Sequence, residues 1–186
     1  MKPMHRNEIL DFVTYGEQRD GIRAKIMELK KPRRIHVGDN LTFLFENTDT
    51  IRYQVQEMVR VERTVKEADI QQEVDTYNEL LGGKGELGCT LMIEIDNEEE
   101  RNVKLRKWLP LTKHLYLKLE DGTKIRATYD SRQVGEDRLS SVQYLKFDTK
   151  GKTPVAIGSD FSELNVEAKL NEAQFRALDQ DLKSDL

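Results

Sequence analysis

The sequence has almost no cysteine and no long apolar run, and each shortage excludes a class of protein. Cys89 is the single cysteine among 186 residues, so no disulfide forms within the chain and nothing points to an oxidising compartment. No apolar run approaches the roughly 20 residues that a membrane-spanning helix needs. The start of the chain, MKPMHRNEILDF, lacks the apolar core of a signal peptide. We therefore expect a cytoplasmic protein with no membrane partner.

The chain also lacks charge of one sign. It has 30 basic and 34 acidic residues, a net charge of −4, although charged residues make up 34% of the total. Such a balanced surface gives no general attraction for nucleic acid or anionic lipid, which argues against nucleic acid as a partner. A chain of 186 residues buries a substantial core without metals or disulfides, and we expect a single domain over residues 1–186.

Motifs of common catalytic and nucleotide sites are missing as well. The sequence has no G-x-S-x-G, Walker, G-x-G-x-x-G or H-E-x-x-H pattern. His5, His36 and His114 show no metal-ligand spacing. The glycine-rich GGKGELG at 82–88 precedes a strand, whereas a phosphate loop precedes a helix, so we expect a turn there. Cys89 falls on the apolar side of that strand, where thiols are inert small hydrophobes.

Hydrophobic periodicity predicts an α+β fold. Strands are predicted at 35–37, 41–46, 87–95, 115–119, 125–129, 141–148 and 154–158. Helices are predicted at 7–31 (in two pieces separated by Gly16 and Gly21), 49–65, 68–81, after an N-cap at Asp96 or Asn97, and at 171–183. Asp121-Gly122 is a hairpin signal, and hairpins outnumber strand–helix alternations. We therefore expect an antiparallel or mixed sheet of about five to seven strands covered by helices.

The segment from 49 to 81 is predicted to form two helices packed on one face of the sheet. The apolar stripe of the first consists of Ile51, Val55, Met58 and Val65, and the stripe of the second is rotated by roughly 110° on the same helical period. Residues 64–67 read TVKE, a capping-box pattern that suggests a break. At roughly 100° per residue, Glu62 falls inside the first stripe. We expect Glu62 to be buried and paired with a basic or amide side chain from elsewhere in the fold.

Charged and amide side chains concentrate along residues 46–73. This candidate polar cluster consists of Glu46, Asn47, Arg52, Gln54, Gln56, Glu57, Arg60, Glu62 and Glu73. Helix-borne carboxylates that converge can hold a metal ion, usually together with histidine, but no Glu-x-x-His motif accompanies them. An internal ion-pair network with Arg52, Arg60 and Arg63 is the simpler interpretation.

Two runs, RRIHVGDNLTFLFENTDTIRYQVQEMVRVER and TYNELLGGKGELGCTLMIEI, resemble an uncharacterised bacterial family known only as a domain of unknown function. The signature positions in this chain are Phe45, Glu46, Asn47, Thr50, Arg52, Gln54, Gln56, Glu57, Met58, Arg60, Glu62, Tyr77, Asn78, Glu86, Thr90 and Glu94. The family pattern has proline after YNEL, where this chain has Gly82-Gly83, so we expect that turn to differ.

The resemblance implies gene neighbours that encode rubrerythrin and an iron–sulfur oxidoreductase, and therefore a role near peroxide or redox defence. It implies no mechanism, cofactor or catalytic residue. Two hypotheses follow. The first is a non-catalytic accessory or interaction protein of a bacterial redox or peroxide-defence system, which the absence of catalytic motifs favours. The second is a metal-dependent enzyme or metal-binding regulator that uses the polar cluster on residues 46–73.

Overall fold

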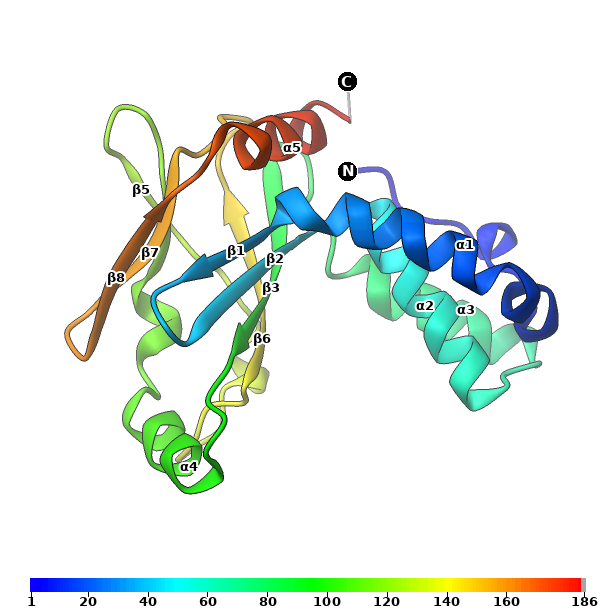
Figure 1. Ribbon diagram of the computed structural model, residues 1–186, viewed down its shortest axis with the longest axis horizontal. Coiled ribbons are helices and arrows are strands. Elements are labelled where there is room, and N and C mark those ends of the chain that lie inside the picture. The colour runs from blue at the N-terminus through cyan, green and yellow to red at the C-terminus, as the bar shows by residue number, and fades with distance from the viewer. Residues whose placement is uncertain (185–186) are drawn as a thin grey trace.

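The computed structural model describes residues 1–184, which contain five α-helices and eight strands in two antiparallel sheets (Figure 1). The first sheet has the order β1 (Arg34–Val37), β2 (Leu41–Glu46), β3 (Glu86–Ile93), β6 (Val142–Asp148). The second has the order β5 (Lys124–Arg126), β4 (Leu115–Lys118), β7 (Ala156–Phe161), β8 (Leu164–Lys169). The α+β class and the antiparallel pairing are confirmed. The strands form two four-stranded sheets instead of one sheet of five to seven.

The hydrophobic core joins the two sheets. Phe43 and Leu91 of the first sheet and Leu117 and Ile157 of the second are fully or almost fully buried in one cluster. The segment LTFLFE of β2 is buried at every position, as its apolar character on both faces predicts. The β4–β5 hairpin around Asp121-Gly122 also forms as predicted, with Leu117 paired to Ile125. The alternating pattern of each strand therefore fixes which side chains enter this core.

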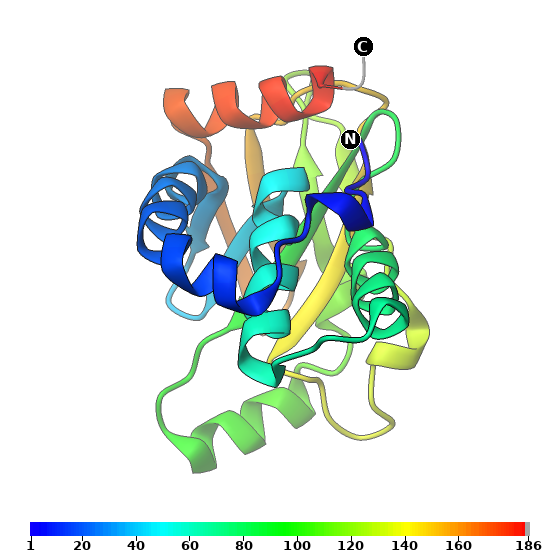
Figure 2. The same cartoon turned by 90° about the vertical axis from the view of Figure 1, so that its right-hand side faces the viewer.

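Three helices form a lobe beside the first sheet, on the side away from the second (Figures 1 and 2). These are α1 (Phe12–Lys30), α2 (Thr48–Glu62) and α3 (Glu67–Asn78). α2 and α3 lie on the same side of the sheet, as expected, but α2 packs mainly on α1 and α3, and α3 packs mainly on α2 and on the turn at Arg6–Glu8. Two further helices, α4 (Glu98–Lys107) and α5 (Glu172–Lys183), lie at opposite ends of the sheets (Figure 1). Within residues 1–184, none of the helices combines the length and the apolar character that crossing a bilayer requires.

The break between α2 and α3 is confirmed, but its chemistry differs from the prediction. Arg63 ends α2 with a left-handed backbone (φ 52°), which turns the chain out of the helix. The predicted capping box at 64–67 is wrong, because Lys66 is the N-cap of α3 and its side chain makes no capping hydrogen bond. The prediction that residues 7–31 form two helices separated by Gly16 and Gly21 is also wrong. A short 3₁₀ turn at Arg6–Glu8 is followed by one unbroken α1.

Helix α1 continues through Gly16 and Gly21 because its beginning is well capped. The Asp11 carboxylate accepts hydrogen bonds from the amides of Val13 and Thr14, which satisfies two of the free donors at the helix start. Each interior glycine costs only about 1 kcal/mol relative to alanine. No atom lies within 4 Å of the position that a Cβ at Gly16 would take.

The glycine-rich segment 82–88 is a tight turn, as predicted, and its glycines allow close backbone contact. A Cβ on Gly88 would lie 2.1 Å from the carbonyl oxygen of Leu80, and one on Gly82 would lie 2.3 Å from that of Glu86. Both distances are far below van der Waals contact, so any side chain at either position would force the turn away from β3. The segment thus joins α3 to β3 and holds the turn against the strand.

Alanine at Gly88 and at Gly16 should change stability in opposite directions. We expect Gly88→Ala to lower the free energy of unfolding by about 1–3 kcal/mol, because the turn must shift to admit the methyl group. We expect Gly16→Ala to raise it by about 0.5–1 kcal/mol, because the site is open and helical. Urea unfolding followed by circular dichroism measures both. A neutral Gly88→Ala would contradict the close contact with Leu80.

Candidate functional site

Glu46 and Asn47 connect the end of β2 to its neighbours. The buried Glu46 carboxylate accepts hydrogen bonds from the hydroxyls of Thr50 on α2 (2.5 Å) and Thr90 on β3 (2.8 Å). The Asn47 side chain caps α2 by accepting from the amide of Thr50 at 3.0 Å. Both residues belong to the predicted polar cluster, and both have structural roles.

Gln56 and Arg52 attach the N-terminal segment to α2. The buried Gln56 amide donates to the carbonyl of Leu10 (2.9 Å) and accepts from its N–H (2.7 Å). Arg52 donates to the carboxylates of Glu8 and Asp49, each at 2.5 Å. The Gln56 side chain thus satisfies the backbone N–H and C=O of Leu10, which have no strand or helix partner in this irregular segment.

Glu57 lies at the contact between α1 and α2. Its carboxylate accepts hydrogen bonds from the Tyr15 hydroxyl (2.6 Å) and from Nε (2.7 Å) and Nη2 (3.0 Å) of Arg19. The guanidinium of Arg60 lies 3.7 Å away. The hydrogen bonds from Arg19, followed by the one from Tyr15, lower the pKa of Glu57 to about 2. This carboxylate is therefore ionised and holds the two helices together.

The burial predicted for Glu62 is wrong. Glu62 is the last residue of α2 and is exposed, and Val65 beyond it is 70% exposed. The helical period used to place Glu62 in an apolar stripe assumed a helix that continues to residue 65. The left-handed Arg63 ends that period, so Val65 does not belong to the stripe.

The carboxylates of the polar cluster do not converge. Gln54 is exposed and Glu73 is half-buried on α3, while Glu46 and Glu57 have separate partners on β3 and α1. In the part of the chain that the structure describes, no group of three or more histidine, cysteine, aspartate or glutamate side chains is arranged to hold a metal. The ion-pair interpretation holds for Glu57 with Arg60. The other ion pairs join the cluster to Glu8, Arg19 and Asp49, which are not members of it.

A buried ion pair that the sequence did not reveal fixes α5 to the rest of the fold. Arg33 donates from Nε to Asp181 Oδ2 (2.7 Å) and from Nη2 to Oδ1 (2.8 Å). The side chains are 4% and 7% exposed. The Nδ2 of Asn47 lies 3.4 Å from the same carboxylate. Arg33 and Asp181 are 148 residues apart, and no local pattern links them.

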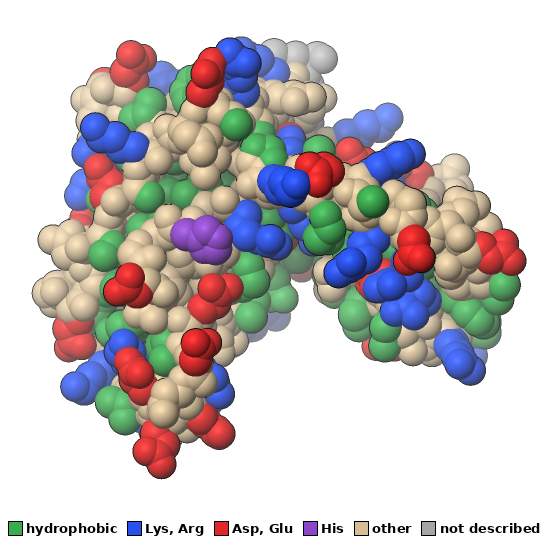
Figure 3. Space-filling model, viewed as in Figure 1, with side chains coloured by type: hydrophobic (Ala, Val, Ile, Leu, Met, Phe, Trp, Pro, Cys, Tyr) green, Lys and Arg blue, Asp and Glu red, His purple; other side chains and the backbone are tan. Residues whose placement is uncertain are grey.

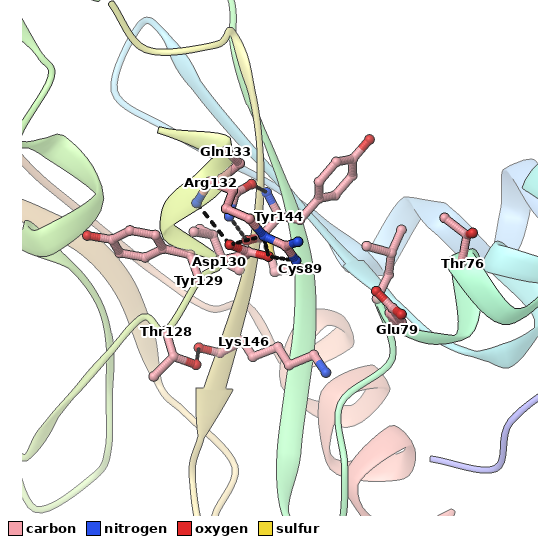
Figure 4. A pocket seen from close by; sticks show the side chains of 12 residues that line it. Thr76, Glu79, Cys89, Thr128, Tyr129, Asp130, Arg132, Gln133, Tyr144 and Lys146 are labelled. Carbon is pink, nitrogen blue, oxygen red and sulfur yellow. Dashed lines mark hydrogen bonds and ion pairs between the residues drawn. The ribbon is translucent and has the colours of Figure 1, made fainter. Parts of the chain in front are cut away.

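A cleft of about 850 Å³ lies between α3 and β6, and we name it the α3–β6 cleft (Figure 4). Its walls come from α3 and the turn after it, from β6, and from the segment 128–133 that follows β5. The residues that line these walls are Thr76, Glu79, Leu80, Tyr144, Leu145, Lys146, Thr128, Tyr129, Asp130, Arg132 and Gln133, and Cys89 of β3 also borders the cleft. The space-filling view shows the hollow that separates the helical lobe from the sheets (Figure 3). No sequence pattern points to this cleft, because its residues come from segments that are separated along the chain.

The α3–β6 cleft combines apolar, aromatic and charged groups. Tyr144 is 46% exposed, and Val142, on the same face of β6, is 39% exposed. Arg132 forms an ion pair with Asp130, and its hydrogen bonds lower the pKa of Asp130 to about 2. Glu79 and Lys146, which also line the cleft, carry charges of opposite sign. Tyrosine and arginine, both present in this cleft, are residue types that are enriched at protein interfaces.

Cys89 lies beneath the cleft but its side chain is in the core. It occupies the face of β3 that Leu87 and Leu91 share, and it is 2% exposed. Burial raises the pKa of the Cys89 thiol well above its ordinary value, and the nearby Glu46 carboxylate adds to this. The inert thiol predicted from the sequence is consistent with this position.

Native Cys89 should react slowly with thiol reagents. We expect labelling by a disulfide reagent such as 5,5′-dithiobis(2-nitrobenzoate) to be at least about a hundredfold slower in buffer than in urea, because the thiolate is both hidden and disfavoured. The absorbance of the released thiolate measures the rate. Labelling at equal rates would show that the strand opens readily and would make Cys89 a candidate redox residue.

Comparisons with known proteins identify a family to which the chain belongs and a solved structure to which it is similar. The family model described as "Protein of unknown function (DUF3501)" matches residues 3–182. The chain is similar to a crystal structure of a novel protein of unknown function from Burkholderia pseudomallei, with a TM-score of 0.88 and 27% sequence identity. That alignment covers 98% of this chain and 100% of the other. Among curated proteins, the comparison found no match.

Proposed function

The chain belongs to the DUF3501 family of proteins of unknown function, and we propose that it is a non-catalytic accessory protein that binds a protein partner in the α3–β6 cleft. The observation that supports this proposal is the cleft itself, where the exposed Tyr144 lies beside charges of both signs. Val142, on the same face of β6, extends the exposed apolar surface beyond the cleft. Exposed aromatic side chains at the centre of a hollow are the usual anchors of protein interfaces. Most charged residues of the family signature, by contrast, hold the fold together.

We propose further that the partner belongs to a redox or peroxide-defence system. The resemblance of the signature runs to the bacterial family implies gene neighbours that encode rubrerythrin and an iron–sulfur oxidoreductase. Proteins encoded side by side are reasonable first candidates for a complex. This argument is one of association and is separate from the argument for the cleft.

Titration of the purified protein with each of these two neighbours tests the proposal. We expect one of them to bind with a dissociation constant in the micromolar range, measured by isothermal titration calorimetry. Tyr144→Ala should weaken that binding about tenfold or more, because tyrosine anchors contribute more than 1 kcal/mol to an interface. The fold of the variant is checked by its circular dichroism and unfolding midpoint.

Phe175→Ala is the matched control. Phe175 is 38% exposed and lies on α5, where it lines a different hollow. We expect this variant to bind the partner as the natural protein does. Equal losses in both variants would place the interface elsewhere, and no binding by either neighbour would contradict the redox partnership.

A further inference from the structure

Strand β6 is an edge strand, and its free edge is covered in an unusual way. It is the last strand in the order of the first sheet, so the backbone groups of every second residue point away from β3. These residues are Val142, Tyr144 and Lys146. An uncovered edge of this kind pairs readily with another extended chain.

The groups that hydrogen-bond to this edge change along β6, from the backbone of another segment to side chains. At Lys146, Thr128 forms a regular antiparallel pair, with both N–H···O distances at 2.8 Å. Beyond Thr128 the chain leaves the edge and enters a 3₁₀ turn at Ser131–Gln133. The Gln133 side chain then donates from Nε2 to the Tyr144 carbonyl and accepts from the Tyr144 N–H, both at 2.8 Å.

The side-chain amide of Gln133 thus makes the two hydrogen bonds that a strand residue would make opposite Tyr144. In an antiparallel pair, facing residues exchange an N–H and a C=O in both directions. At Val142, the next residue whose backbone faces outward, the N–H donates to the Ser140 hydroxyl at 3.2 Å. The contacts of Gln133 with Tyr144 and of Ser140 with Val142 are exposed to solvent.

We propose that the edge of β6 at Val142–Tyr144 is a strand-addition site, which Gln133 and Ser140 occupy in the free protein and an extended segment of a partner protein occupies in the complex. The segment runs antiparallel to β6 and extends the line of Thr128 along the edge. It replaces the Gln133 amide at Tyr144 with backbone N–H and C=O groups. Its side chains then meet the exposed Tyr144 in the α3–β6 cleft and the exposed Val142 on the same face of β6.

Because the site pairs through backbone hydrogen bonds, the ligand that fits it is an extended polypeptide. The donors and acceptors at Tyr144 match an extended polypeptide, and strand addition derives affinity from main-chain bonds and specificity from alternate side chains. The inference deepens the proposed function and rests on it, because it states how a protein partner is held. We therefore test it with peptides alone, so that it can fail separately from the redox partnership.

A phage-displayed library of nine-residue peptides, selected on the purified protein, supplies the probe. We expect enriched sequences whose synthetic peptides bind and shift the amide resonances of Val142 and Tyr144 in NMR spectra. N-methylation of one central peptide residue should abolish binding, because that residue loses the N–H that donates to the Tyr144 carbonyl. An N-methyl scan that leaves affinity unchanged at every position, or a selection that enriches no peptide, overturns the proposal.

Gln133→Ala gives the sharper test, because the proposal predicts that this variant binds the peptide more tightly. If the Gln133 amide competes with the peptide, its removal raises the binding-competent fraction and should tighten peptide binding about tenfold. Gln71→Ala is the matched control, since Gln71 makes a single exposed hydrogen bond to Asp75 on α3, and its affinity should not change. Weaker or unchanged binding by Gln133→Ala overturns the proposal. Ser140→Ala serves as the second variant, with a smaller gain expected from the loss of one bond.

Discussion

Arg33→Ala should lower the free energy of unfolding by about 3–5 kcal/mol, the cost of leaving one member of a buried ion pair without its partner. The Asp181 carboxylate would then keep only the Asn47 amide, at 3.4 Å, among its side-chain donors. Arg33 also donates from Nη1 to the carbonyl of Leu29 at 2.8 Å, and the variant loses that contact too. Urea unfolding, followed by circular dichroism and by the fluorescence of Trp108, measures the loss.

An exposed pair on the same helix is the control. Arg176 and Glu172 on α5 form an i, i+4 ion pair whose side chains are 75% and 77% exposed. Arg176→Ala should therefore cost no more than about 0.5 kcal/mol. The double variant Arg33→Met with Asp181→Leu should recover most of the stability, because apolar side chains fill the same space without an unpaired charge. A loss below about 1 kcal/mol in Arg33→Ala would mean that water reaches the pair.

Local sequence patterns predicted most of the helices and strands of this fold, because each pattern acts over a few residues. Strand β8 (Leu164–Lys169) was not predicted. Asn97 caps α4 by accepting from the Glu100 amide at 2.8 Å, and Asn171 caps α5 in the same way at Gln174. The division of the strands between two sheets had no local signal. Strand β3 pairs with β6 and β4 with β7, across long connections that strand periodicity does not describe.

The candidate site shows the same limit. Glu46 and Glu57 were predicted as members of a polar cluster, but Thr90 on β3 and Arg19 on α1, which donate to them, lie outside residues 46–73. Periodicity assigns a residue to a face only while the helix continues, and Glu62 lies where α2 ends. The cleft residues Tyr144 and Gln133 carry no motif at all. Their function depends on which segments the fold brings together.

Glu57 should make the protein sensitive to acid. Its pKa falls from 4.5 to about 2 in the folded protein, chiefly through the hydrogen bonds from Arg19. A carboxylate whose folded pKa is lowered stabilises the protein above its unfolded pKa, near 4.5, and that contribution is lost as the pH falls toward the folded pKa. The side chain is 17% exposed, so we expect a loss on the order of 3 kcal/mol between about pH 5 and pH 2.

Glu57→Gln isolates this contribution from that of the other carboxylates. The variant should be less stable than the natural protein at pH 7, and the difference between their free energies of unfolding should shrink as the pH falls from 5 to 2. Asp130→Asn is the matched control, because the pKa of Asp130 is also about 2. Its partner Arg132 is two residues away, and both side chains are exposed. Solvent screens such a pair, so its loss should leave the acid limb almost unchanged. Parallel curves for Glu57→Gln and the natural protein down to pH 2 would show that Arg19 and Tyr15 do not hold an ionised Glu57 between α1 and α2.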